Sequence, residues 1–95
     1  MLIRSQDKTA LVKFENIVIN LKLPESLKVI CWSLQDAQRS GGYFILGEYS
    51  TKAKAMKVLD MIQEAYCKFM SVKNDDAWDG KESVFYMPED GSVEE

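Results

Sequence analysis

The stretch Gly47-Glu48-Tyr49-Ser50-Thr51 separates two parts of the chain that carry different patterns of apolar residues. Before it, short apolar runs repeat with a period of two, which predicts β-strands. After it, one long segment carries apolar residues at helical spacing. Ser50 and Thr51 come just before that segment, and either hydroxyl can cap the first turn of a helix. We therefore expect the last strand of the sheet to end, and the helix to begin, within this stretch.

The segment after the corner predicts a helix of about 20 residues that ends near Ser71. At about 100° per residue, its apolar side chains fall on one arc of about 140°. These side chains are Ala55, Val58, Leu59, Ile62, Tyr66, Phe69 and Met70. Charged residues lie on the opposite side and include Glu64 and Lys68, a favourable pair four positions apart. One face of the helix is therefore expected to cover a sheet.

Five strand candidates precede the helix and one follows it. Their ranges are 2–5, 10–14, 17–23, 27–34, 43–49 and 83–87. After Phe14 the apolar residues move from even to odd positions, and a regular strand cannot switch faces. A bulge or tight turn is expected at Glu15-Asn16, so that residues 10–23 form two short strands or one kinked strand.

The pattern as a whole predicts an α+β fold. We expect an antiparallel sheet of four to six short strands with one long amphipathic helix packed on it, in the order β-β-β-β-β-α-β. The polar loop that ends in Gly41-Gly42 most simply closes a hairpin. Gly47 lies near the end of its strand, where it permits a bulge or a close approach of the helix.

The length of 95 residues suits one domain, expected over residues 1–88, with an acidic and flexible tail at 89–95. No apolar run approaches the roughly 20 residues of a membrane span, and the N-terminus lacks the apolar core of a signal peptide. The cysteines Cys31 and Cys67 are expected to stay reduced. These features predict a cytoplasmic location.

The formal net charge of −3 is unevenly distributed along the chain. Residues 1–73 carry a net charge of +4, and residues 74–95 carry −7. The acidic part can pair with the basic part or repel polyanions, and in either case strong binding of nucleic acid by the whole chain is not expected.

The sequence offers little for catalysis or for metal binding. It contains no histidine, which removes the commonest general base and nearly all zinc patterns. Asp75, Asp79 and Gly80 partly match a calcium loop, but Ala77 and Tyr86 stand where ligands are needed. An acidic loop anchored by a tryptophan is the simpler interpretation. We expect no enzyme activity, no cofactor and no metal.

Two surfaces are candidates for binding. The start of the helix is a candidate anion site, formed by Ser50, Thr51, Lys52, Lys54 and Lys57. The alternative interpretation is an ordinary solvated face. Strand 27–34 is apolar on both faces, so a second subunit is expected to cover the face that the helix leaves open. The interface candidates are Val29, Cys31, Trp32, Tyr43 and Trp78.

Three stretches resemble a family of small uncharacterised proteins from Gram-positive bacteria and their mobile elements. They are Met1-Leu2-Ile3-Arg4-Ser5-Gln6-Asp7-Lys8 with Leu11-Val12 and Asn16-Ile17, Leu46-Gly47-Glu48-Tyr49-Ser50-Thr51 with Ala55, Val58-Leu59 and Ile62, and Val84-Phe85-Tyr86-Met87-Pro88. The resemblance implies an intracellular bacterial protein without an assigned activity, and it supplies no catalytic residues.

The sequence thus favours a non-enzymatic protein-interaction module that forms a homodimer. The alternative is an accessory protein that binds an anion or nucleic acid through the lysines at the helix start. A small enzyme is a third class, which a deep pocket holding Glu48 or Asp36 with a raised pKa would favour.

Overall fold

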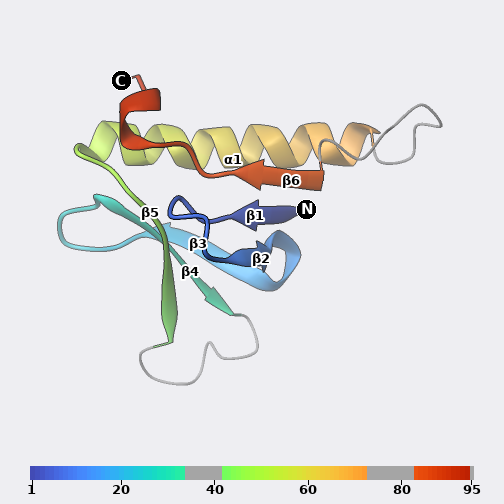
Figure 1. The fold of residues 1–95 in the computed structure, drawn as a ribbon, viewed down its shortest axis with the longest axis horizontal. Coiled ribbons are helices and arrows are strands. Elements are labelled where there is room, and N and C mark those ends of the chain that lie inside the picture. Colours follow the sequence, from blue (N-terminus) through green and yellow to red (C-terminus); the bar gives the residue numbers. More distant parts are fainter. Residues whose placement is uncertain (34–41, 73–82, 95) are drawn as a thin grey trace.

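The computed structural model describes residues 1–33, 42–72 and 83–94. Within them, five strands precede a long helix and a sixth follows it (Figure 1). The strands are β1 (Leu2–Arg4), β2 (Leu11–Lys13), β3 (Ile17–Leu21), β4 (Lys28–Ser33), β5 (Tyr43–Glu48) and β6 (Val84–Tyr86). The helix α1 spans Lys52–Val72, and the short 3-10 helices η1 and η3 span Phe14–Asn16 and Asp90–Ser92. The predicted α+β class with one long helix is confirmed.

The strands form two three-stranded sheets, in the orders β2-β1-β6 and β3-β4-β5. The prediction of one antiparallel sheet is corrected in two respects, because the strands divide between two sheets and β6 pairs with β1 in parallel. The helix η1 lies where the apolar residues change parity, and the chain leaves the first sheet there. In the sequence, β3, β4, β5 and α1 come between β1 and β6. The connection is therefore long enough for β6 to pair with β1 in parallel.

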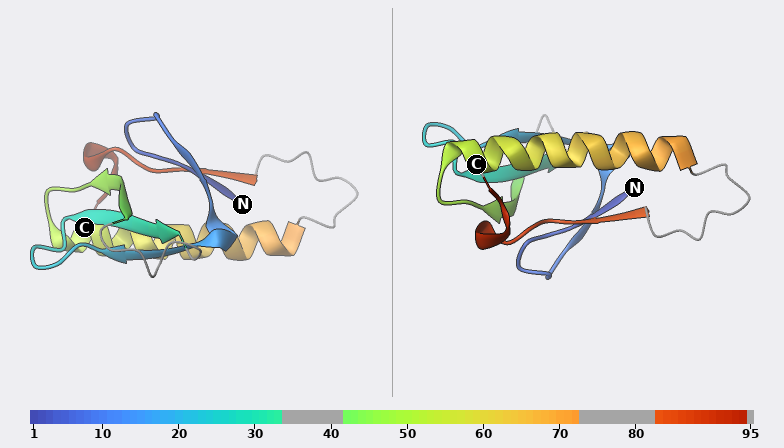
Figure 2. Two further views of the ribbon diagram at one scale, coloured as in Figure 1. Left: turned by 90° about the horizontal axis from the view of Figure 1, so that it is seen from below. Right: turned by 90° about the horizontal axis from the view of Figure 1, so that it is seen from above.

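Helix α1 lies along β3 and β4 and covers the inner face of their sheet (Figure 2). It begins as predicted, because the Thr51 hydroxyl accepts a hydrogen bond from the Lys54 N–H at 3.2 Å. Ala55, Val58 and Ile62 on the predicted arc are buried. Met70 on the same arc is exposed, because the last turns of α1 extend beyond the sheet.

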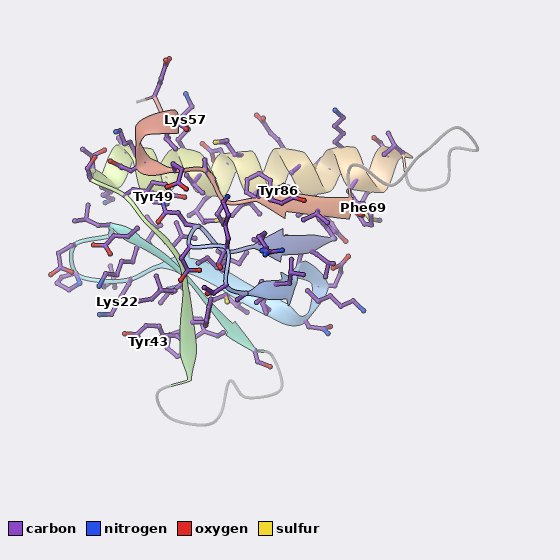
Figure 3. The ribbon with its side chains drawn as sticks, viewed as in Figure 1. Lys22, Tyr43, Tyr49, Lys57, Phe69 and Tyr86 are labelled. Carbon is purple, nitrogen blue, oxygen red and sulfur yellow. The ribbon has the colours of Figure 1, made fainter. Side chains whose placement is uncertain are left out.

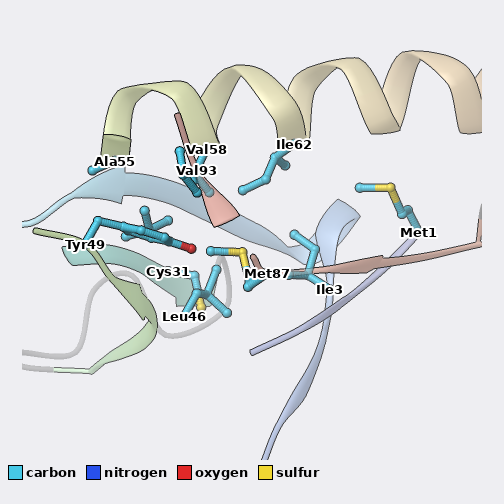
Figure 4. Packing of buried hydrophobic residues seen from close by; sticks show 11 residues of the cluster. Met1, Ile3, Cys31, Leu46, Tyr49, Ala55, Val58, Ile62, Met87 and Val93 are labelled. Carbon is cyan, nitrogen blue, oxygen red and sulfur yellow. The ribbon is translucent and has the colours of Figure 1, made fainter. Parts of the chain in front are cut away.

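The core lies between α1, the inner face of β3-β4-β5 and the strand pair β1-β6 (Figure 4). Its fully or nearly buried members are Met1, Ile3, Val29, Cys31, Leu46, Tyr49, Ala55, Val58, Ile62, Met87 and Val93. Residues from both sheets, the helix and the C-terminal segment therefore share one core.

The corner at Gly47 is set by close packing. The register of β4 and β5 shifts between Val29 and Ile30, and Leu46 is the extra residue on β5. The Tyr49 side chain is buried, and its hydroxyl donates to the Pro88 carbonyl at 2.8 Å. A Cβ at Gly47 would lie 2.9 Å from that hydroxyl. The bulge expected near Gly47 is present, but the atoms that would lie nearest to an added Cβ belong to Tyr49 and Met87 and not to the helix.

Gln6 ties the two sheets together. Its N–H donates to the Leu46 carbonyl at 2.7 Å, and its side-chain amide donates to the carbonyls of Glu48 and Pro88, each at 3.1 Å. Its side-chain oxygen accepts the Glu48 N–H at 3.0 Å. One side chain at the end of β1 thus fixes the ends of β5 and β6.

The C-terminal segment packs on the body of the protein. Asp90–Ser92 forms η3, and Val93 is only 4% exposed. The sequence predicted a flexible acidic tail from residue 89, whereas in this fold Val93 contributes an apolar side chain to the core beside α1 (Figure 4).

Candidate interaction surface

The face of β3-β4-β5 that points away from α1, here called the outer face, carries two rows of side chains. Residues directly opposite on neighbouring strands point to the same face. The register pairs Val18 with Trp32 and Trp32 with Tyr43, which gives the first row. The second row holds Asn20, Ile30 and Ile45. The outer face is therefore largely apolar and aromatic.

Local contacts hold Trp32 in place on this face. Its indole N–H donates to the Asn20 side-chain oxygen at 2.8 Å, and its ring lies 5.4 Å from the Tyr43 ring, centroid to centroid, at a tilt of 56°. The Lys22 ammonium lies 5.6 Å from the centroid of the Tyr43 ring, and Figure 3 shows the two side chains side by side. Contacts within the chain thus hold the aromatic pair in place.

Exposed apolar residues gather on β5, at the end of the sheet far from α1 (Figure 1). Tyr43, Phe44 and Ile45 are 38%, 40% and 41% exposed. Val18 on β3 is also exposed. Phe44 and Ile45 were absent from the predicted interface residues. The signal that could have found them is the uncharged run Tyr43-Phe44-Ile45 in a strand at the edge of a sheet.

The predicted interface residues divide between the two sides of the sheet. Val29 and Cys31 lie on the inner face beneath α1 and are buried, so neither is available to a partner in this fold. Burial raises the pKa of the Cys31 thiol. Trp32 and Tyr43 lie together on the outer face, as an interface would require. Trp78 and the acidic loop around it lie outside the described residues.

The predicted anion site at the start of α1 holds a carboxylate of the same chain. The Ser50 N–H donates to the Asp90 side chain at 2.7 Å, and this bond lowers the pKa of Asp90. The Lys54 ammonium donates to the Asp90 backbone carbonyl at 3.2 Å and lies 3.7 Å from its carboxylate. Lys52 and Lys57 are exposed. The sequence carried no local signal for this contact, because Asp90 lies 40 positions after Ser50.

A shallow apolar groove of about 340 Å³ lies between α1 and β3. Its lining residues are Phe14, Ile17, Ile19, Leu59, Ile62, Gln63, Tyr66 and Cys67. The rings of Phe14 and Tyr66 are in contact at 4.5 Å between centroids and form one wall. Among the described residues, no aspartate, glutamate, lysine or arginine lines this groove.

The carboxylates with perturbed pKa values have structural contacts. Ser5 and Thr9 donate hydrogen bonds to Asp7 in the turn after β1 and lower its pKa to about 2. The Met1 ammonium lies 2.7 Å from the Glu15 carboxylate, and its hydrogen bond lowers the pKa of Glu15. A general acid needs a raised carboxyl pKa, and both shifts have the opposite sign.

Across the described part of the chain, no cluster of three or more histidine, cysteine, aspartate or glutamate residues is placed to hold a metal ion. In the same residues, no helix has the length and apolarity needed to cross a bilayer. Comparisons with protein-family models, curated proteins and solved structures find no match for this chain. The resemblance noted in the sequence therefore stays a prediction.

Proposed function

We propose that this protein is a non-enzymatic interaction module that forms a homodimer through its β3-β4-β5 sheet. The observation that carries the proposal is the gathering of exposed apolar side chains on this one sheet, with Tyr43, Phe44 and Ile45 consecutive on β5. Tyr43 and Ile45 lie on the outer face with Trp32, whereas Phe44 lies opposite Cys31 on the other face. Exposed apolar surface marks interaction sites in soluble domains, because water covers it at a cost in free energy.

The organisation of Trp32 and Tyr43 supports the same proposal. Tryptophan and tyrosine provide large contact areas with few rotatable bonds, so they lose little entropy on binding. The hydrogen bond from Trp32 to Asn20 and the Lys22 contact with Tyr43 restrict these side chains further in the free protein. Preorganised aromatic residues are typical anchors of protein interfaces.

Self-association also agrees with the size of the protein. A chain of 95 residues buries a modest core, and burying a further apolar face against a second copy adds stability. A partner that covers Tyr43, Phe44 and Ile45 removes from water the largest apolar side chains of β5 that remain exposed.

The alternative proposal, an anion or nucleic-acid binding protein, has less support. The helix start does accept a carboxylate, since Ser50 and Lys54 both bind Asp90. An external phosphate or carboxylate would have to displace this residue, which the chain holds close by at high effective concentration. Salt-dependent retention on heparin that increases in Asp90→Ala would favour this alternative.

The test is the oligomeric state, measured by sedimentation velocity at micromolar concentration. We expect the wild-type protein to be a dimer. Ile45→Lys places a charge on each copy at the proposed interface and is expected to weaken dimerisation by at least about tenfold, or about 1.4 kcal/mol. Leu11→Lys is the matched control, because Leu11 is exposed on β2 of the other sheet. A monomeric wild-type protein, or equal effects of both variants, would contradict the proposal.

A further inference from the structure

Strand β5 presents an open edge over only part of its length. Among the described residues it is the last strand of its sheet, so alternate backbone N–H and C=O groups point away from β4. At one end, Gln6 occupies this edge through its bonds to the Leu46 carbonyl and the Glu48 N–H. At the other end, Tyr43, Phe44 and Ile45 remain. The available edge is therefore confined to three consecutive residues.

This open part carries none of the side chains that usually protect an edge strand, although it is short and ends at the bulge at Leu46. Natural proteins guard such edges with lysine, proline or inward-pointing charges, because an unpaired edge binds another strand. Tyr43-Phe44-Ile45 contains none of these, and all three residues are exposed. An unguarded edge that is apolar on both faces matches a partner strand that is also apolar on both faces.

From these features we infer that the partner is a second copy of this chain, whose own Tyr43–Ile45 pairs antiparallel with the first and joins the two three-stranded sheets into one of six strands. This inference rests on the proposed homodimer and specifies how it forms. An antiparallel pair of identical strands is self-complementary about a two-fold axis. Because the run is uncharged, no like charges are brought together.

The faces of β5 and its bond to Gln6 limit the possible registers of this pairing. Side chains that are opposite each other in the two copies must lie on the same face. Tyr43 or Ile45 of one copy can therefore be opposite only Tyr43 or Ile45 of the other copy, and Phe44 can be opposite only Phe44. The register that uses all three residues and leaves Leu46 bonded to Gln6 opposes Tyr43 to the partner's Ile45 and places Phe44 on the axis. Each copy then contributes one aromatic residue opposite a β-branched one, which is a favourable cross-strand pair.

Disulfide trapping tests this register. The experiment uses a Cys67→Ser background, which removes the exposed thiol, and keeps Cys31 because it is buried. The variants Tyr43→Cys and Ile45→Cys are purified separately, mixed and mildly oxidised. Residues directly opposite have Cα atoms about 4.5–5.5 Å apart, within the range of a disulfide. Like residues lie diagonally at about 7–8 Å, beyond that range. We expect a covalent dimer from the mixture and none from either variant alone.

Val18→Cys is the control, because Val18 is exposed on the same sheet but at its opposite edge. Mixed with Ile45→Cys, it is expected to give no covalent dimer. Cross-linking of a single variant as fast as the mixture, or cross-linking of Val18→Cys, would overturn the inferred register. If Tyr43→Cys and Ile45→Cys become monomeric while Val18→Cys stays dimeric, the interface is at this edge.

Sedimentation of the same samples under reducing conditions separates the two proposals. A wild-type dimer whose dimeric variants give no mixed cross-link would overturn the strand pairing and leave the homodimer through this sheet standing. A wild-type monomer at micromolar concentration would overturn both.

Discussion

The close approach of Gly47 and Tyr49 gives a quantitative test of the corner at which sheet and helix meet. A methyl group at residue 47 would lie 2.9 Å from the Tyr49 hydroxyl, 3.1 Å from its Cε2 and 3.3 Å from the Met87 Cε. The Tyr49 ring is buried and held by its bond to Pro88, so it has little room to move. Gly47→Ala is therefore expected to overpack the core.

Two effects of opposite sign set the size of the change. Overpacking costs typically about 1–3 kcal/mol. Alanine also reduces the entropy of the unfolded chain, which stabilises by about 0.4–1 kcal/mol where the backbone suits it. We expect Gly47→Ala to lower the free energy of unfolding by about 1–2 kcal/mol. Tyr49→Phe is expected to cost about 1 kcal/mol, because Pro88 keeps its second hydrogen bond from Gln6.

The double variant isolates the contact itself. Tyr49→Phe removes the nearest atom, so Gly47→Ala is expected to cost less in that background, with a coupling of about 1 kcal/mol. Urea unfolding followed by far-UV circular dichroism measures all four proteins at one fixed concentration. Gly91→Ala is the control, because nothing lies within 4 Å of the added atom. Additive effects within about 0.5 kcal/mol, or a neutral Gly47→Ala, would refute the packing argument.

Four further outcomes are expected. Lys8 has a φ of 67°, so Lys8→Gly should raise the free energy of unfolding by up to about 1 kcal/mol, and a loss of stability in thermal unfolding would contradict this. Asp90→Asn should reduce the stability near neutral pH and make the stability depend less on acid pH. The lowered pKa of the Asp90 carboxyl contributes stability above its ordinary value of 3.8, and this contribution is lost as the pH falls through the folded pKa. Urea midpoints of wild type and variant that stay parallel down to about pH 2 would speak against it. Ellman's reagent should titrate the exposed Cys67 rapidly in the native protein and the buried Cys31 only in denaturant. Gln6→Ala should cost about 1–3 kcal/mol, measured by urea unfolding, since it removes the hydrogen bonds that join the ends of β5 and β6; unchanged stability would count against that role.

The candidate sites show which residues a local pattern can identify. Trp32 and Tyr43 were expected to face outward, and they lie in contact on the outer face. Val29 and Cys31 were expected there as well, because an apolar strand does not reveal which of its faces the helix covers. The carboxylate that binds at the helix start comes from Asp90, far along the chain, and no spacing rule connects it with Ser50.

The sequence alone determined the local elements. The period of apolar residues predicts the strands and the helix, and the change of parity at Glu15-Asn16 predicts the break at η1. Each of these patterns depends only on residues within a few positions of one another. The tertiary structure decided that the strands divide into two sheets, that β6 lies parallel to β1, and that Tyr49 fills the space beside Gly47. These features depend on contacts between residues tens of positions apart, whose free energies are set by packing and by shared hydrogen bonds such as those of Gln6.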